Sequence, residues 1–293
     1  MLMGRVVAFL RLTRIEHSLM LIVAVLAAEL IAGNGRLPTA FILLLSLVTP
    51  ALVSMGSFAI NDYYDIETDR ANKRVDRPII AGVIKPREAF WTAIACFIIG
   101  VLASALINSA AFVIALVFAV LAYAYSYKLK NTLLLGNAYI AFSMAIPFVY
   151  GSYVVSDSML PSLLVVFAII FLSGLAREIH GLIRDYAGDR KARHSRSLPY
   201  YIGKRGSAIT AMILYLAAIA LSAELFVYFR PFLGNMVYIA PIFVTDLLLL
   251  YVGIVYLGAK AKREYGIARN LSLGAMGLAL FAILFSSLLY IPV

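Results

Sequence analysis

Nine long apolar segments run through the chain and constrain its fold more than any other feature. A helix needs roughly 17 to 25 mainly apolar residues to cross the hydrocarbon core of a bilayer. The connections leave no stretch large enough for a separate soluble core, so we expect one all-α integral membrane domain over residues 1–293. The segments lie near residues 18–33, 38–60, 88–107, 110–127, 133–153, 161–183, 207–229, 236–258 and 268–290.

The basic residues indicate how these helices cross the membrane. If the N-terminus is cytoplasmic, all 25 Lys and Arg residues except Arg36 and Arg230 fall on the cytoplasmic side, as the positive-inside rule requires. We therefore expect a multi-pass protein of the cell membrane with a cytoplasmic N-terminus. The formal charge of +10 then indicates contact with membrane lipid and no nucleic-acid partner. A single cysteine, Cys96, excludes an internal disulfide or a cysteine metal cluster.

Two long connections, Asn61 to Arg87 and Arg184 to Lys204, carry the residues of greatest chemical interest and share one pattern. Each has two aspartates four residues apart, then basic residues, then Pro-x-x-x-Gly. This spacing predicts an internal repeat over about 1–131 and 132–260, with two related four-helix halves and a ninth helix appended. Membrane folds built from repeats commonly place their site between the repeats. The matched residues are Asp65, Asp69, Pro78 and Gly82 in the first connection and Asp185, Asp189, Pro199 and Gly203 in the second.

The acidic residues of these connections have the chemistry of a magnesium site. If the second helix continues past its apolar stretch, Asn61, Asp65 and Asp69 stack on one face. Like charges so placed repel each other, and a bound cation relieves the repulsion. Oxygen ligands without His or Cys indicate a hard ion, and Mg²⁺ typically takes one or two carboxylates plus substrate phosphate oxygens. Asp185 and Asp189 supply a second such pair.

The string Asn61-Asp62-x-x-Asp65-x-x-x-Asp69, followed by Arg77-Pro78 and Gly82 and later by Asp185-x-x-x-Asp189, resembles the UbiA superfamily of intramembrane prenyltransferases. The resemblance covers the whole chain. It implies nine transmembrane helices around a central cavity, with the two cytoplasmic loops as a cap. It implies that Asp65, Asp69, Asp185 and Asp189 are catalytic, and that these four with Asn61 and Asp62 hold Mg²⁺. The diphosphate-binding residues that it implies are Arg14, Arg77, Lys128 and Lys191.

The resemblance implies transfer of an isoprenyl group from a prenyl diphosphate to a lipophilic acceptor inside the membrane. Mg²⁺ and positioned basic residues neutralise the leaving diphosphate, and its departure leaves an allylic carbocation that must be shielded from water. Aromatic faces stabilise such a cation. The candidates for the acceptor or carbocation pocket are His17, Tyr123, Tyr139, Phe142 and Tyr150.

Two kinds of acceptor fit the sequence. Arg14-Ile15-Glu16-His17 resembles the start of quinone-pathway members, whose acceptor is an aromatic ring such as 4-hydroxybenzoate. The stretch from Asn61 to Gly82, with Arg177-Glu178-Ile179, resembles archaeal members that alkylate geranylgeranylglyceryl phosphate in ether-lipid synthesis. We favour the aromatic acceptor from sequence, with digeranylgeranylglyceryl phosphate synthesis as the alternative. A transporter is a more distant alternative, because Asp246 lies inside an apolar segment.

Overall fold

All the regular structure in the described part of the chain is helical. The structure is a computed structural model that describes residues 2–132, 134–193, 197–258 and 262–290, without the side chains of 2, 3, 131, 187–193 and 262. Its elements are α1 (Leu2–Thr13), α2 (Ile15–Ala32), α3 (Ala40–Tyr64), α4 (Ile66–Ala71), α5 (Pro86–Ala105), α6 (Ser109–Tyr127), the 3₁₀ turn η1 (Leu129–Asn131), α7 (Leu135–Val155), α8 (Pro161–Arg193), α9 (Leu198–Tyr228), α10 (Met236–Gly258) and α11 (Lys262–Leu288).

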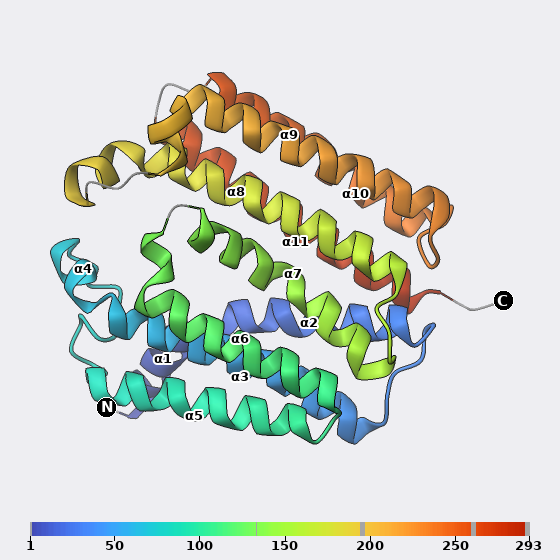
Figure 1. Ribbon diagram of the computed structural model, residues 1–293, viewed down its shortest axis with the longest axis horizontal. Coiled ribbons are helices and arrows are strands. Elements are labelled where there is room, and N and C mark those ends of the chain that lie inside the picture. The colour runs from blue at the N-terminus through green and yellow to red at the C-terminus, as the bar shows by residue number, and fades with distance from the viewer. Residues whose placement is uncertain (1, 133, 194–196, 259–261, 291–293) are drawn as a thin grey trace.

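Within these described ranges, nine helices are long and apolar enough to cross a membrane, namely α2, α3 and α5 to α11. Helices that follow one another in the chain pack side by side, and α11 returns to contact α2, which closes the ring. Figure 1 shows α2, α3, α5 and α6 on one side and α8 to α11 on the other, with α7 between them. The all-α membrane fold expected from the sequence is confirmed.

Glycines allow the closest approaches between these helices. A Cβ atom added to Gly151 of α7 would lie 2.6 Å from the Cβ of Ala28 in α2, and one added to Gly56 of α3 would lie 2.9 Å from the ring of Phe97 in α5. Lipid tails are as apolar as the helices, so helix association in a bilayer depends on close van der Waals packing of small residues. These glycines therefore determine how closely α2 packs on α7 and α3 on α5.

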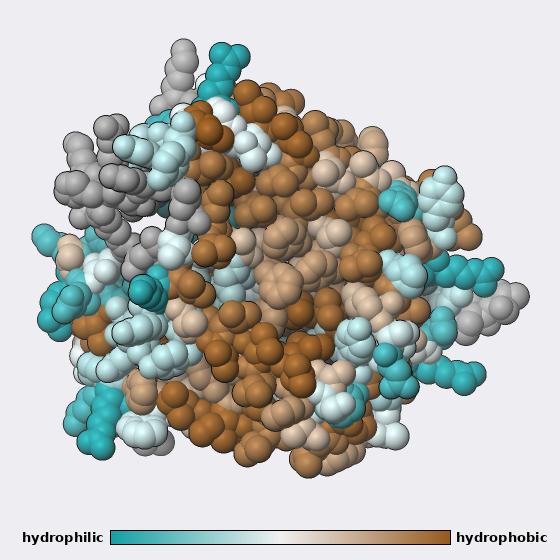
Figure 2. All heavy atoms as spheres, in the orientation of Figure 1, coloured by the Kyte–Doolittle hydropathy of each residue, from teal (hydrophilic) through white to brown (hydrophobic). Residues whose placement is uncertain are grey.

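The surface has the pattern expected of a protein in lipid. Figure 2 shows an apolar belt between two polar ends. Large apolar side chains such as Leu102, Ile213 and Phe243 are each about 60% exposed, and a water-soluble surface rarely gathers so many of them. The protein is therefore a multi-pass membrane protein.

Both aspartate motifs lie at one end of the ring, which we call the motif end. Figure 1 shows α4 and the C-terminal end of α8 there, together with α1. Four membrane crossings separate the end of α3 from the end of α8, so the chain returns to the side from which it started. This placement is the first requirement for two motifs that share one substrate.

The first motif departs from the continuous helix predicted for it. α3 ends at Tyr64, and Asp65 (φ −92°, ψ 4°) separates it from α4. Nevertheless, the backbone N–H of Asp65 donates to the carbonyl of Asn61 at 2.9 Å, and that of Asp69 donates to the carbonyl of Asp65 at 2.7 Å. The helical spacing of the three side chains thus persists across the break.

Three further breaks were not visible in the hydropathy pattern. Arg14 has a left-handed backbone (φ 46°) between α1 and α2, and Leu134 (φ 58°) precedes α7. α9 begins at Leu198, earlier than the predicted segment at 207, and contains a kink at Gly203 with φ 72°. Gly82, the residue matched to Gly203 by the predicted repeat, also has φ 72°. Positive φ is a conformation that glycine adopts readily and other residues do not.

Candidate functional site

Asp62 is the buried centre of the first motif. The left-handed turn at Arg14 and the segment after α4 bring two guanidinium groups to it. Arg14 Nη2 donates to Asp62 Oδ1 at 3.1 Å and Arg77 Nη1 donates to the same oxygen at 2.9 Å. The Asp62 side chain is 2% exposed, and its Oδ2 atom has no hydrogen-bond partner among the described residues. Asp62, predicted as a metal ligand, thus holds two of the predicted diphosphate-binding arginines.

Asp65 lies one turn further on and is more accessible. Asn61 Nδ2 donates to its Oδ2 at 3.0 Å, and Lys130 Nζ donates to its Oδ1 at 2.5 Å. Lys130 comes from η1, which follows α6. The predicted Lys128 is instead exposed and forms no ion pair with another described residue. The lysine next to the motif is therefore two residues from the predicted one.

Asp69 completes the first motif on α4. Its Oδ2 atom lies 3.7 Å from Arg77 Nε. Burial raises the pKa of Asp69, and the Arg77 guanidinium opposes that rise. The neighbouring Asp76 is exposed and differs, because two hydrogen bonds from Arg74 hold its pKa at about 2. Asp69 is therefore the carboxylate of this segment that gains most from a second cation.

The first motif has oxygen donors suited to magnesium. We define the donor cluster as Asp62, Asp65, Asp69, Arg14, Arg77 and Lys130, in which three carboxylates meet three cations. The described residues contain no group of three His, Cys, Asp or Glu placed to hold a metal unaided. Mg²⁺ does not require such a cage, since substrate oxygens and water complete its shell. Asn61, Asp65 and Asp69, spaced by single helical turns, fit this partial coordination.

The second motif lies at the end of α8. Arg184 Nε and Nη2 donate to the two carboxylate oxygens of Asp185 at 2.8 and 2.6 Å. The Asp185 side chain is half-exposed at 47%, so it can be reached from the motif end. Asp189 and Lys191 belong to the helical backbone of α8, but their side chains lie outside the described residues.

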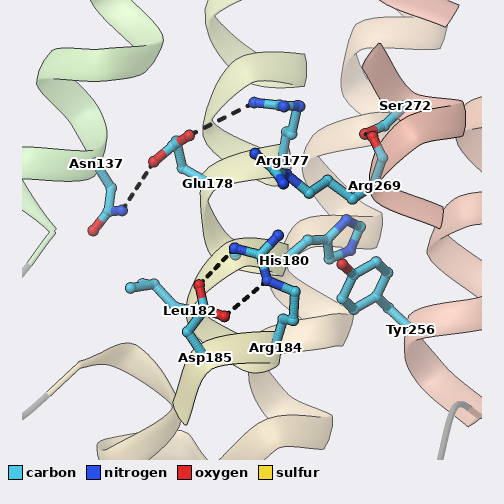
Figure 3. Close-up of a pocket in the computed structure, with 11 residues that line it drawn as sticks. Asn137, Arg177, Glu178, His180, Leu182, Arg184, Asp185, Tyr256, Arg269 and Ser272 are labelled. Carbon is cyan, nitrogen blue, oxygen red and sulfur yellow. Dashed lines mark hydrogen bonds and ion pairs between the residues drawn. The ribbon is translucent and has the colours of Figure 1, made fainter. Parts of the chain in front are cut away.

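A polar cavity of about 220 Å³ lies beside the second motif, between α7, α8, α10 and α11. Figure 3 shows Glu178 between Asn137 and Arg177, and the Arg184–Asp185 pair below them. Asn137 Nδ2 donates to Glu178 Oε2 at 3.3 Å. The sequence alone suggests no function for most of the residues that line this cavity. Arg177 and Glu178 lie inside a predicted apolar segment, and charges within membrane helices commonly mark functional sites, so that signal could have found them.

Aromatic rings of α6, α7 and α8 pack on one another in the interior. Tyr125 of α6 stacks on Tyr139 of α7 at 4.8 Å, and Phe118 stacks on Phe142 at 5.4 Å. Phe142 in turn meets Phe167 of α8 at 5.5 Å. The Tyr125 hydroxyl interacts electrostatically with Glu178, Asp65 and Arg14. Tyr125 thus lies between the donor cluster and the polar cavity.

Three of the predicted pocket residues lie elsewhere. Tyr123 is exposed, and its hydroxyl is 2.7 Å from that of Tyr64. His17 is half-exposed beside Glu16 and packs on Phe58. Tyr150 is buried eleven residues after Tyr139 on α7, which places it about 16 Å further from the motif end at 1.5 Å per residue. The structure brings Tyr139 and Phe142 together, and it adds Tyr125, whose face of α6 differs from that of Tyr123.

Comparisons with known proteins agree with this geometry. The sequence matches the model of the UbiA prenyltransferase family over residues 20–274. It is 36% identical over 269 residues to the digeranylgeranylglyceryl phosphate synthase of Archaeoglobus fulgidus, an alignment that covers 92% of this chain and 91% of that protein.

Solved structures have the same fold. One is described as "Structural and mechanistic insights into the biosynthesis of Digeranylgeranylglyceryl phosphate synthase in membranes" and matches with a TM-score of 0.79 and 27% identity, over 97% of this chain and 99% of that chain. A UbiA homolog from Archaeoglobus fulgidus bound to GPP and Mg²⁺ matches with a TM-score of 0.62 and 21% identity, over 94% of this chain and 99% of that chain.

Proposed function

This chain belongs to the UbiA prenyltransferase family and is a prenyltransferase, and on that premise we propose that it alkylates the hydroxyl of a glycerol-phosphate lipid with an isoprenyl group. The observation that carries this proposal is the donor cluster, where three carboxylates and three cations meet at the motif end. Such a cluster suits a prenyl diphosphate that arrives with magnesium.

The residues of the donor cluster have different roles in binding the diphosphate. Arg14, Arg77 and Lys130 are placed to meet its negative charge, since arginine and lysine side chains bind phosphate oxygens strongly. Asn61, Asp65 and Asp69 would hold Mg²⁺, with Asp185 opposite. The ion supplies positive charge that stabilises the departing diphosphate. Asp62 keeps the two arginines in position through its hydrogen bonds.

The interior aromatic rings suit the second part of the reaction. When the bond between the prenyl carbon and the diphosphate breaks, an allylic cation remains until the acceptor oxygen bonds to that carbon and releases its proton. The stacked rings of Tyr125, Tyr139, Phe118 and Phe142 support a dry path in which aromatic faces stabilise the cation by about 0.5 to 2 kcal/mol each.

The relatives support a glycerol-phosphate acceptor over an aromatic one. The sequence alone favoured an aromatic quinone precursor, on the strength of the segment Arg14 to His17. In the structure His17 lies half-exposed beside Glu16, and Arg14 is engaged with Asp62. The curated relatives named digeranylgeranylglyceryl phosphate synthase align over nearly the whole chain, which supports the alternative.

The test is a paired acceptor assay on purified protein in detergent. Labelled prenyl diphosphates of several lengths are supplied with geranylgeranylglyceryl phosphate or with 4-hydroxybenzoate, and lipid products are separated by chromatography. We expect product with the glycerol phosphate only, its loss in EDTA and its recovery with Mg²⁺.

Two results would contradict the proposal in different ways. Product with 4-hydroxybenzoate alone would return the acceptor to the quinone class while leaving prenyl transfer intact. Full activity in excess EDTA would remove the assigned role of Asn61, Asp65 and Asp69.

A further inference from the structure

We propose that the polar cavity beside the second motif binds the phosphate group of the acceptor lipid, through Arg177, Arg269 and His180. This inference rests on the proposed function, because it concerns where that acceptor is held. The cavity is separate from the donor cluster in its elements: its walls come from α7, α8, α10 and α11, whereas the donor cluster comes from α3, α4, η1 and the segments next to them.

The cavity has an excess of positive charge. Arg177, Arg184 and Arg269 line it together with two carboxylates, Glu178 and Asp185. The donor cluster, by contrast, contains equal numbers of acidic and basic groups. Arg269 is repelled by Arg184 and Arg177 and attracted by Asp185, and guanidinium groups gathered in one site repel one another unless an anion lies among them. The excess of positive charge in the cavity therefore suits an anion.

Several donors in the cavity have no protein partner. Arg177 Nε and both ring nitrogens of His180 are buried without a hydrogen bond to any described residue. The His180 ring is 2% exposed and is held flat against Tyr256, with ring centroids 3.8 Å apart. Arg269 is exposed and makes no ion pair within the described ranges. Buried polar groups without partners are costly, so Arg177 Nε and the two His180 ring nitrogens indicate a ligand that the protein takes from outside.

The two carboxylates are already engaged in ways that leave these donors free. Glu178 accepts from Asn137 and lies 3.9 Å from Arg177 Nη1, which orients the guanidinium without using its Nε. Asp185 is held by both nitrogens of Arg184. Figure 3 shows Arg177 and Arg269 on one side of the cavity and the Arg184–Asp185 pair on the other.

A phosphate monoester is the anion that fits this arrangement and the reaction. Planar guanidinium groups bind phosphate oxygens in pairs. Glycerol has only three carbons, so an acceptor phosphate must lie close to the attacking hydroxyl and hence beside the donor. The cavity meets this demand, because Asp185 of the second motif lines it and Tyr125 interacts electrostatically with both Glu178 of the cavity and Asp65 of the donor cluster.

The experiment compares two acceptors in wild-type protein and in Arg269→Gln. One acceptor is geranylgeranylglyceryl phosphate, and the other is the same lipid without its phosphate. Arg269 is exposed at the helix surface, so its replacement should leave the fold intact. We expect KM for the phosphorylated acceptor to rise roughly 10-fold to 100-fold, as for loss of a hydrogen bond to a charged group, while KM for the donor and kinetics with the dephosphorylated acceptor stay unchanged.

Two further variants sharpen the result. Arg177→Lys keeps the charge but removes the planar fork, and it should also raise KM for the phosphorylated acceptor selectively. Arg87→Gln removes an exposed arginine at the motif end outside the cavity and should change neither KM. A general effect of surface charge would instead appear in Arg87→Gln as well.

The outcomes separate this inference from the proposed function. If Arg269→Gln raises KM for the donor, or slows both acceptors equally, the cavity does not hold the acceptor phosphate, and the proposed function is left untouched. If wild-type protein uses only 4-hydroxybenzoate, the proposed function itself fails. Selective loss on the phosphorylated lipid in a protein that otherwise turns over normally supports both.

Discussion

The first motif contains three aspartates close together in the sequence, Asp62, Asp65 and Asp69, but the surroundings of their side chains differ. Asp62 is buried between two arginines, Asp65 faces Asn61 and Lys130, and Asp69 lies near Arg77 alone. A replacement at each position should therefore have its own result. Comparing these replacements separates a binding role from a stabilising one.

Asp65→Asn should reduce turnover by about 10² to 10³, because loss of one preorganised electrostatic group in an active site has that effect. Folding should be preserved, since the amide keeps the shape and Asp65 is not fully buried. Steady-state assays and thermal unfolding in detergent measure the two quantities. The matched control is Asp157→Asn, an exposed position at the other end of the ring, and an equal loss there would mean that the effect is not local.

Asp62→Ala should lower stability by about 3 to 5 kcal/mol, because it leaves two partly buried arginines without their carboxylate. Thermal unfolding in detergent should show a clearly lower midpoint. Asp76→Ala provides the control, since its pair with Arg74 is exposed and exposed pairs contribute about 0 to 1 kcal/mol. An Asp62→Ala protein that is as stable as wild type but inactive would instead indicate that Asp62 acts mainly in ligand binding and contributes little to stability.

Breaks between helices position the side chains of the donor cluster. Arg14 reaches Asp62 because a left-handed residue separates α1 from α2, and Lys130 reaches Asp65 from a short turn between α6 and α7. The two Pro-x-x-x-Gly segments turn at Gly82 and Gly203, both with φ 72°. Equal φ values at matched positions support the proposed repeat of two four-helix halves.

Gly203→Ala should destabilise the protein by about 1 to 3 kcal/mol, because its backbone (φ 72°, ψ 168°) lies in a region that is essentially limited to glycine. A Cβ there meets no atom within 4 Å, so the strain is in the backbone alone. Gly277→Ala is the control, because Gly277 lies within α11, also has open space around it and has no positive φ. It should be neutral or slightly stabilising, and a Gly203→Ala midpoint no lower than that of Gly277→Ala would contradict the strained turn.

The sequence predicts the membrane crossings but not the contacts between side chains of different helices. The membrane crossings followed from hydropathy, because length and apolar character are local properties. The Lys130–Asp65 contact joins residues 65 positions apart, and no pattern in the sequence selects Lys130 over Lys128. Tyr123 and Tyr125 lie in a helix that is apolar all round, so periodicity did not distinguish the outward from the inward tyrosine.

At the scale of the whole molecule, the ring places both motifs at one end, and the basic residues indicate which side of the membrane that end faces. We predict the cytoplasmic side. Cysteines introduced at Lys73 or Lys204, in a Cys96→Ala background, should react with an impermeant reagent only from the cytoplasmic face. Cysteines at Asn34 or Asp157 should react only from the other face.

The labelling pattern also tests the shared site. Reaction of positions 73 and 204 from opposite faces would place the two motifs on different sides and contradict a common diphosphate. Reaction of both from outside would keep the shared site but reverse the orientation that the positive-inside rule predicts.

The ion pairs of the donor cluster have a thermodynamic consequence. We expect a diphosphate that binds Lys130 to draw it away from Asp65 and leave the carboxylate free for Mg²⁺, and we expect Mg²⁺ at Asp65 to free the lysine in turn. Each ligand would then prepare the site for the other, and linkage requires that the factor by which Mg²⁺ tightens donor binding equals the factor by which the donor tightens Mg²⁺ binding. The Lys130–Asp65 ion pair would keep Mg²⁺ weakly bound until the donor arrives.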